Sequence, residues 1–305
     1  MIKQTLYFGN PAKLSVEHNQ LKIRLSSTGE SVEEGIFTRP LEDIGILIID
    51  SPQIVVTSPV LQKILEYGAA LIVCDQKHMP AGLMINMAGH TLQSERFKVQ
   101  LNAKLPLKKR LWQQTVSAKI RNQGALLTQR FNEEFGNMEA WAKKVRSGDP
   151  ENLEARAAAF YWKTILQPTQ ASNRDPEGAE PNAMLNYGYA ILRAMMARAL
   201  VASGMHPTLG IFHKNKYNPY CLADDIMEPY RPYVDRIVFD MLDINPDSTI
   251  ENKETKRRLL SIPTSDVVID GIRRPMLIGI TETTASLFKC FSGEESRVHY
   301  PDMMA

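Results

Sequence analysis

Residues 204–232 combine two histidines, a basic loop and three closely spaced carboxylates, in the stretch "GMHPTLGIFHKNKYNPYCLADDIMEPYRP". His213 follows the apolar run "LGIF", and Asp225 and Glu228 come 12 and 15 residues after it. Because Asp225 and Glu228 are three residues apart, they would share one face of a helix. An imidazole beside carboxylates can bind a divalent metal ion. For the carboxylates alone, an acidic first turn that stabilises its own helix is an equally good interpretation.

A further carboxylate that could do chemistry is Glu154, in the segment "SGDPENLEARAAAFYWKTIL". Asp149 and Pro150 predict the start of a helix as N-cap and first helical residue. Glu151 then falls in the first turn, where the helix dipole favours an anion, so we assign it no chemistry. Glu154 lies one turn further, on an alanine-lined face that ends at Tyr161 and that a ligand could approach closely. Taken alone, Glu154 is more simply a solvated glutamate.

Together, Glu154, His213 and Glu228 offer two carboxylates and one imidazole. That set suits Mg²⁺ or Mn²⁺ and leaves coordination positions for water and phosphate oxygens. No thiolate is available to favour zinc, although the imidazole could accept it. A metal ion held there would polarise a phosphoryl oxygen and stabilise charge on the attacking and leaving oxygens. The spacing of these residues therefore indicates phosphodiester chemistry without establishing it.

The positive charge of the chain is concentrated in its central part. The net charge is only +2, yet residues 91–146 carry 12 basic and 4 acidic side chains, and Arg96 to Arg130 include nine Lys or Arg and no acid. A solvated helix face usually mixes both signs. We therefore favour binding of DNA or RNA phosphates, which Lys and Arg contact without reading sequence. The candidate side chains in this run are Lys104, Lys108, Lys109, Arg110, Lys119 and Arg121.

The bulk composition is that of an ordinary folded protein, with 305 residues, 44% hydrophobic and 23% charged. The length suggests two domains. No apolar run approaches the ~18 residues that a membrane span needs, and the N-terminus lacks a signal-peptide pattern, so we expect a cytoplasmic protein that is not bound to a membrane. The three cysteines, Cys74, Cys221 and Cys290, are far apart, which argues against a disulfide framework and a structural zinc site.

The hydrophobic pattern changes period near Gly89. Before it, short β-branched or alternating runs predict strands, and "SPVLQKILEYG" predicts one helix that begins at Ser58 and Pro59 and stops at Gly68. The predicted strands lie in residues 4–10, 12–25, 45–51, 53–58 and 69–75. We expect "QKHMPAG" to be a turn.

After Gly89, apolar residues follow a helical period to about residue 245. The helical breaks are predicted at residues 146–150, 168–181 and 203–210. The remaining chain should contain at least one more helix and end in a polar, mobile segment. The fold class is therefore α+β, with a β-rich domain at 1–89 and an α-helical domain at 90–305.

Three segments resemble a known family: "LEARAAAFYW", "NYGYAILRAMMARALVASGMHPTLGIFH" and "KNKYNPYCLADDIMEPYRPYVDR". They resemble the CRISPR-associated adaptation integrase ("Cas one"), most closely its type II subgroup, and the similarity covers nearly the whole chain. "CDQKHMPAG" and the "LW…KIRNQ" run also look familiar. The resemblance implies an N-terminal β-sandwich followed by an all-α C-terminal domain that carries the catalytic and DNA-binding residues.

The resemblance also implies a reaction, in which the 3′-hydroxyl ends of short foreign DNA fragments are joined to the CRISPR array by transesterification. The metal ligands implied by the family motifs are Glu154, His213 and Glu228, with Asp225 as a supporting position. Many relatives have aspartate at the third position, so Asp225 stays open as the alternative ligand, although the longer Glu228 side chain should still reach. Residues beside the motifs are expected to contact DNA, namely Tyr161, Asn186, Lys214, Lys216 and Arg231.

The partners implied by the resemblance are DNA, a second copy of the chain, and a small companion protein ("Cas two") in a heterohexamer. The N-terminal domain would supply dimer contacts, because a sandwich has edges and faces to bury. Two other functions remain open from the sequence. One is a general metal-dependent nuclease that degrades DNA or RNA without joining it, and the other is a non-enzymatic DNA-binding scaffold.

Overall fold

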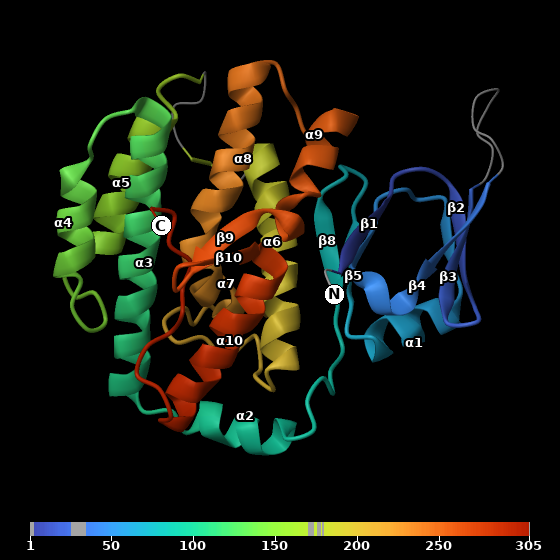
Figure 1. Ribbon diagram of the computed structural model, residues 1–305, viewed down its shortest axis with the longest axis horizontal. Coiled ribbons are helices and arrows are strands. Elements are labelled where there is room, and N and C mark those ends of the chain that lie inside the picture. Colours follow the sequence, from blue (N-terminus) through green and yellow to red (C-terminus); the bar gives the residue numbers. More distant parts are fainter. Residues whose placement is uncertain (1–2, 26–34, 170–173, 176–177, 179, 305) are drawn as a thin grey trace. The chain divides into compact units, whose positions relative to one another are not determined.

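The chain folds into two compact units, Met1–Gly89 and His90–Ala305. The computed structural model describes residues 3–25, 35–169, 174–175, 178 and 180–304. Figure 1 shows strands in the first unit and mostly helices in the second, which confirms the α+β class. No helix in the described residues is both long enough and apolar enough to cross a bilayer.

The first unit contains two four-stranded sheets. One has the order β1 (Gln4–Phe8), β5 (Ile44–Ile49), β7 (Ala70–Cys74) and β8 (Pro80–Met84), in which only β8 is antiparallel to its neighbour. The other has the order β4 (Ile36–Pro40), β3 (Gln20–Leu25), β2 (Ala12–Glu17) and β6 (Ile54–Val56). Strands β4 and β8 lie outside the predicted set, because β4 exposes all five side chains and β8 contains a proline and a glycine.

The two sheets share one hydrophobic core, as expected of a sandwich. Leu14 and Leu21 from one sheet and Ile44 and Leu47 from the other belong to the same cluster of buried side chains. The predicted helix is present as α1 (Ser58–Glu66), which adds Val60 and Ile64 to this core, and a short 3₁₀ helix η1 (Leu41–Asp43) joins the sheets. Gly68 follows α1 with φ +65°, the left-handed conformation that glycine adopts without strain.

The second unit is built mainly of helices, and α3, α6, α8 and α10 run side by side in Figure 1. Its elements in chain order are α2 (Gln93–Leu101), α3 (Leu105–Phe131), α4 (Gly136–Lys144), α5 (Leu153–Ile165), α6 (Asn182–Ala202), α7 (Cys221–Met227), η2 (Glu228–Tyr230), α8 (Arg231–Ile244), α9 (Lys253–Leu259), η3 (Ile262–Thr264), β9 (Asp266–Ile269), β10 (Ile272–Pro275) and α10 (Met276–Ser292). The predicted break at 168–181 lies partly outside the described residues.

The second unit is not purely α-helical, because β9 and β10 form an antiparallel hairpin. Asp270 and Gly271 make its two-residue turn, with φ values of +50° and +75°. Asp-Gly is a favoured pair for such turns, since both positions need a positive φ. The hairpin corrects the expectation of an all-α domain and leaves the class unchanged.

The C-terminal segment is packed, so the expectation of a mobile tail is wrong. Val298 and Met303 are buried. The Gln114 side chain on α3 accepts the Val298 N–H at 2.8 Å, and the Asn122 amide donates to the Pro301 carbonyl at 3.0 Å. Polar side chains of α3 thus satisfy the backbone of a segment that has no regular structure of its own.

Candidate active site

Glu154 lies in the first turn of α5 rather than one turn in. The helix begins at Leu153, after Asn152 in the left-handed conformation (φ +51°). Asp149 still caps the helix, because its carboxylate accepts the N–H groups of Leu153 at 3.0 Å and Glu154 at 2.9 Å. Glu151 falls outside the helix and pairs with Arg146 at the surface. The capping contacts fix the backbone of Glu154, whose side chain is 24% exposed.

Glu228 begins the 3₁₀ turn η2 between α7 and α8, with Pro229 behind it. The Asn122 amide on α3 donates to the Pro229 carbonyl at 2.8 Å, which holds this turn against α3. Arg231 approaches Glu228 from the start of α8, with its Nε 3.0 Å from Glu228 Oε1. The Glu228 side chain is therefore paired with Arg231 of α8 and is only 8% exposed.

Lys119 joins the two glutamates. Its Nζ lies 2.5 Å from Glu154 Oε1 and 2.7 Å from Glu228 Oε2, and its side chain is 10% exposed. Three segments distant in sequence thus meet at one ammonium group: α3, α5 and η2. The two carboxylates converge on a single cation, which is how carboxylate ligands approach a metal ion.

The opposite charges of Glu228 and Lys119 favour the ionised form of each group. Burial by itself raises the pKa of Glu228, but the charges of Arg231 and Lys119 outweigh it, so the net pKa lies below its ordinary value. Burial likewise lowers the pKa of Lys119, and Glu228 and Glu154 reverse that effect and raise it. The carboxylate of Glu228 is therefore ionised, as a metal ligand must be.

His213 is oriented by Asp225, which is completely buried. His213 Nδ1 lies 2.5 Å from Asp225 Oδ1, and the other oxygen accepts the N–H groups of Ile211 at 2.8 Å and Phe212 at 2.9 Å. The His213 N–H also reaches Oδ1 at 3.2 Å. Asp225 thus binds the 211–213 segment, and any ligand of the His213 ring would have to come to Nε2.

Gly210 permits this close packing. A Cβ atom at position 210 would lie 2.4 Å from the His213 carbonyl oxygen and 3.0 Å from Asp225 Oδ2. Such distances are too short for a side chain. The glycine three residues before His213 is therefore required by the turn that brings the histidine back over α7.

The His213 ring also packs against two stacked aromatic rings. Trp112 on α3 is buried and stacks on Phe212 with ring centroids 4.1 Å apart and planes 2° apart. His213 meets both rings edge-on, at 5.6 Å and 5.3 Å. The Asp225 hydrogen bond raises the pKa of His213 against a smaller opposing effect of burial, and the charges of Asp225, Glu228 and Glu154 add to the rise. The imidazole therefore shares the electrostatic field of both glutamates.

A metal ion fits this donor set, although the side chains are not arranged around one. Within the described residues, no three His, Cys, Asp or Glu side chains form a ready metal cluster. The fit rests on chemistry: two carboxylates already converge on one cation, and His213 lies in their field. Oxygen and imidazole ligands of this kind suit Mg²⁺ or Mn²⁺.

Most of the predicted phosphate-binding side chains lie at the surface, whereas Lys119 is buried. Lys104 precedes α3, and Lys109 and Arg110 in its first turns are exposed, with Lys108 half-buried. Lys214 and Lys216 are exposed in the loop after His213. Lys119 does not belong with them, because its ammonium lies between Glu154 and Glu228 rather than at the surface.

Three residues predicted to contact DNA have partners inside the protein. Tyr161 is completely buried and donates to Asp235 at 2.6 Å, which argues against a DNA contact. Asn186 is half-buried and accepts a hydrogen bond from Arg174. Arg231 pairs with Glu228 and lies over the Tyr189 ring at 4.5 Å. Of these three side chains, Arg231 contacts the candidate site, through Glu228.

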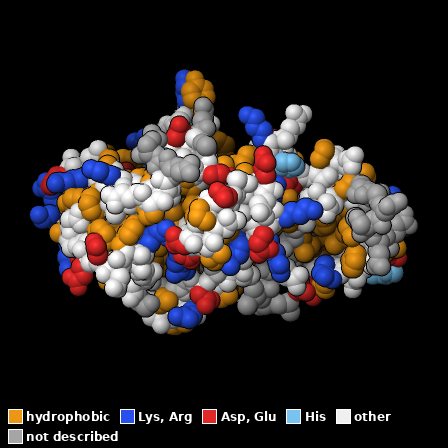
Figure 2. All heavy atoms as spheres, turned by 90° about the horizontal axis from the view of Figure 1, so that it is seen from above, with side chains coloured by type: hydrophobic (Ala, Val, Ile, Leu, Met, Phe, Trp, Pro, Cys, Tyr) orange, Lys and Arg blue, Asp and Glu red, His pale blue; other side chains and the backbone are white. Residues whose placement is uncertain are grey.

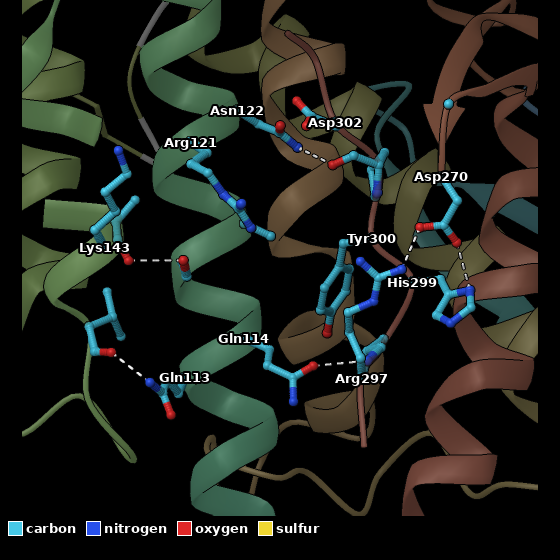
Figure 3. A pocket seen from close by; sticks show the side chains of 17 residues that line it. Gln113, Gln114, Arg121, Asn122, Lys143, Asp270, Arg297, His299, Tyr300 and Asp302 are labelled. Carbon is cyan, nitrogen blue, oxygen red and sulfur yellow. Dashed lines mark hydrogen bonds and ion pairs between the residues drawn. The ribbon is translucent and has the colours of Figure 1, made fainter. Parts of the chain in front are cut away.

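A polar cleft of about 500 Å³ lies along another face of α3 (Figure 3). Arg121 and Lys143 line it from α3 and α4, and Arg297 and His299 line it from the C-terminal segment. Asp270 pairs with both Arg297 at 2.7 Å and His299 at 2.9 Å. Of the described residues, those lining the cleft do not include the glutamate pair, so the cleft is separate from the candidate site.

The surface is mixed in charge on the face seen in Figure 2, where Lys and Arg side chains lie among Asp and Glu. The described residues form no continuous basic surface on that face. Carboxylates from elsewhere in the chain pair with cations of the 35-residue run that has no acids. Glu154 and Glu228 pair with Lys119, and Asp243 pairs with Arg130.

Comparison with known proteins places the chain in a family. The profile of the CRISPR associated protein Cas1 matches residues 6–261. This chain belongs to the Cas1 family. The CRISPR-associated endonuclease Cas1 of Neisseria meningitidis serogroup C is 39% identical over 242 residues, which cover 79% of this chain and 76% of that protein. The resemblance inferred from the motifs is thereby confirmed.

Solved structures share the Cas1 fold at low identity. A casposase bound to an integration product superposes with a TM-score of 0.82 at 18% identity, over 100% of this chain and 93% of that one. A chain of a Cas6-RT-Cas1–Cas2 complex superposes with a TM-score of 0.76 at 17% identity, over 98% of this chain and 36% of that one. These superpositions support the α+β fold of this Cas1 family member.

Several residues that build the site in this Cas1 family member were not found from sequence. In the sequence Lys119 belongs to the basic run, because a sequence shows charge without showing which face of a long helix turns inward. Trp112 and Phe212 are 100 residues apart, and no local pattern pairs them. The "Gly-x-x-His" spacing of Gly210 and His213 was the one available sign of the tight turn.

Proposed function

We propose that this Cas1 family protein is a metal-dependent DNA integrase and endonuclease of CRISPR adaptation. In this proposal it joins the 3′-hydroxyl ends of short foreign DNA fragments to the CRISPR array by transesterification. The observation that carries the proposal is the convergence of Glu154 and Glu228 on one cation beside an oriented histidine. The named endonuclease in Neisseria meningitidis and the casposase bound to its integration product support it.

Glu154, Glu228 and Nε2 of His213 would hold Mg²⁺ or Mn²⁺. When bound, the ion would stabilise negative charge on the attacking and leaving oxygens of a phosphodiester. We assign Asp225 the orientation of His213, because both its oxygens already accept hydrogen bonds from the 211–213 segment. Glu228 is then the third ligand, and Arg231 and Lys119 keep it ionised.

DNA phosphates would meet the exposed cations at the start of α3 and in the loop after His213. These are Lys104, Lys108, Lys109, Arg110, Lys214 and Lys216, with Arg121 on the neighbouring cleft. The further partners in the proposal are a second copy of this chain and the small protein Cas2, in a heterohexamer. The similarity to a chain of a Cas6-RT-Cas1–Cas2 complex supports Cas2 as a partner.

The proposal is tested by a strand-transfer assay on a supercoiled target with Mn²⁺, Cas2 and a DNA fragment that carries free 3′-hydroxyls. We expect His213→Ala to lower joining by at least about 10³-fold, because several kcal/mol of charge stabilisation depend on the metal. His206→Ala is the matched control. His206 is exposed, contacts the Thr208 N–H through Nδ1 and lies outside the cluster, so joining should persist.

The same assay separates the other two functions. A fragment without 3′-hydroxyls that is still degraded, with no joined product from the intact fragment, would indicate a general nuclease. Wild-type and His213→Ala proteins that bind DNA equally and neither join nor cut would indicate a scaffold. Either result would contradict the integrase proposal.

A further inference from the structure

Lys119 occupies the place where the two glutamates converge. Its ammonium lies within 2.7 Å of an oxygen on each of Glu154 and Glu228, and all three side chains are at least three-quarters buried. Without a cation there, two ionised carboxylates would face one another at close range and repel. The structure therefore contains a cation of its own at the candidate metal site.

A divalent ion and this ammonium cannot share that place. Mg²⁺ binds carboxylate oxygens at about 2.0–2.1 Å, so an ion held by both glutamates would lie at the position of Nζ or directly against it. Two positive charges so close in a buried site would repel strongly. We infer that Lys119 is a built-in counter-cation that holds the ligand carboxylates together before metal binding and is displaced when the metal binds. This inference rests on the proposed function.

Contacts that do not involve Lys119 hold the Glu228 carboxylate and the backbone of Glu154. Arg231 continues to hold Glu228 through Oε1, the oxygen that Lys119 does not contact. Asp149 holds the backbone of Glu154 at the start of α5. The lysine itself is a point charge on a flexible four-carbon stem, which can swing away, whereas Arg231 is fixed by Glu228 and by the Tyr189 ring.

Competition between the two cations can be measured without any DNA or catalysis. Mn²⁺ binding is titrated calorimetrically to the wild type, to Lys119→Met and to Lys163→Met. Methionine keeps the length and apolar character of the lysine stem and removes the charge. Lys163→Met is the matched control, since Lys163 is exposed on α5, the helix that carries Glu154. We expect Lys119→Met to bind Mn²⁺ at least about tenfold more tightly and Lys163→Met to match the wild type.

A second measurement uses the wild-type protein alone. Lysine acetylation by a soluble reagent is followed by mass spectrometry as Mn²⁺ is added. Lys119 should react slowly without metal, because it is buried and paired, and its modification should rise along the Mn²⁺ binding curve. Lys163 should react equally at every Mn²⁺ concentration. This measurement decides the question if Lys119→Met does not fold.

The outcomes separate this inference from the proposed function. If the wild type binds Mn²⁺ and Lys119→Met binds it equally or more weakly, Lys119 is not a competing cation and the metal site stands. If Mn²⁺ leaves Lys119 acetylation unchanged while it binds, the displacement is wrong. If no protein binds Mn²⁺, the metal site itself fails, and Lys119 is then a permanent partner of the two glutamates.

Discussion

Glu228 and Asp235 are two buried carboxylates seven residues apart, and their surroundings shift their pKa values in opposite directions. Glu228 lies between Lys119 and Arg231, and these cations lower its pKa despite its burial. Asp235 is 1% exposed and accepts hydrogen bonds from two phenols, Tyr161 at 2.6 Å and Tyr189 at 2.5 Å. Burial raises the pKa of Asp235 to about 6, because the hydrogen bonds and more distant arginines offset only part of it.

The difference shows that burial alone does not determine what a carboxylate can do. A carboxylate next to cations stays ionised and can serve as a ligand. A carboxylate whose hydrogen bonds only partly offset its burial, such as Asp235, shifts toward the protonated state. Arg231 links the two regions, since it pairs with Glu228 and lies over the ring of Tyr189. Arg231 is therefore packed between the charged cluster and the group formed by Tyr161, Tyr189 and Asp235.

The largest effect should come from the protonation of Asp235. Its folded pKa of about 6 exceeds its ordinary value of 3.8, so the folded state favours the proton. The resulting stability is fully present below about pH 4 and is lost as the pH rises through 6. Relative to Asp235→Asn, the wild type should lose up to roughly 3 kcal/mol of unfolding free energy between pH 4 and 7. Urea unfolding at several pH values measures this.

The difference in unfolding free energy between the wild type and Asp235→Asn reports on Asp235, because all other titratable groups are common to both proteins and cancel. A difference in unfolding free energy that stays constant from pH 4 to 7 would show that Asp235 is ionised throughout. The contrast with Glu228 would then disappear.

A smaller effect is expected at the charged cluster when the histidine loses its orienting carboxylate. Asp225→Asn keeps the shape but removes the charge that fixes the His213 ring, and such outer contacts typically change metal affinity by about 10–100-fold. Mn²⁺ titration should show this loss. Asp243→Asn, which breaks the surface pair with Arg130, should leave Mn²⁺ affinity unchanged. Equal affinities in the two variants would mean that Asp225 does not position a metal ligand.

The smallest effect separates two buried tyrosines. Tyr161→Phe removes one hydrogen bond to Asp235 and should lower the free energy of unfolding by about 1 kcal/mol. Tyr233 is also buried, but its hydroxyl has no hydrogen-bond partner among the described residues, so Tyr233→Phe should change stability little. Urea unfolding of both variants at neutral pH makes the comparison. A larger loss in Tyr233→Phe would show that the hydrogen bonds of Tyr161 and Tyr189 to Asp235 do not stabilise the fold more than an unpaired buried phenol does.

Much of the fold follows from local patterns in the sequence. The runs that became β1, β2, β5 and β7 are short and rich in apolar residues, and α1 carries its own start and stop signals. Strand β4 was missed because none of its side chains is buried, so no alternation marks it. The β9–β10 hairpin was missed although Asp270 and Gly271 are a strong turn signal, because the strands are only four residues each.

The candidate site could be predicted in part. Spacing and residue type singled out Glu154, His213 and Glu228. The sequence did not show which groups pair, since Lys119 and Tyr161 sit on helices whose inward faces are decided by packing. The sequence predicts both as DNA contacts, whereas the structure pairs both with carboxylates inside the protein. A helix such as α3, polar and apolar on several faces, gives no periodic sign of which lysine is buried.

The packing of residues 296–304 against α3 has a consequence for the order in which the protein is completed. Gln114 and Asn122 on α3 hold the backbone of residues that follow them by about 180 positions in the chain. During synthesis, α3 emerges long before that segment. Until those residues have been synthesised, the side-chain amides of Gln114 and Asn122 can form these hydrogen bonds only with water. The packing of the helical unit around α3 is complete only after residues 296–304 have been synthesised, so a ribosome stalled before residue 296 would hold a chain whose α3 still lacks these contacts.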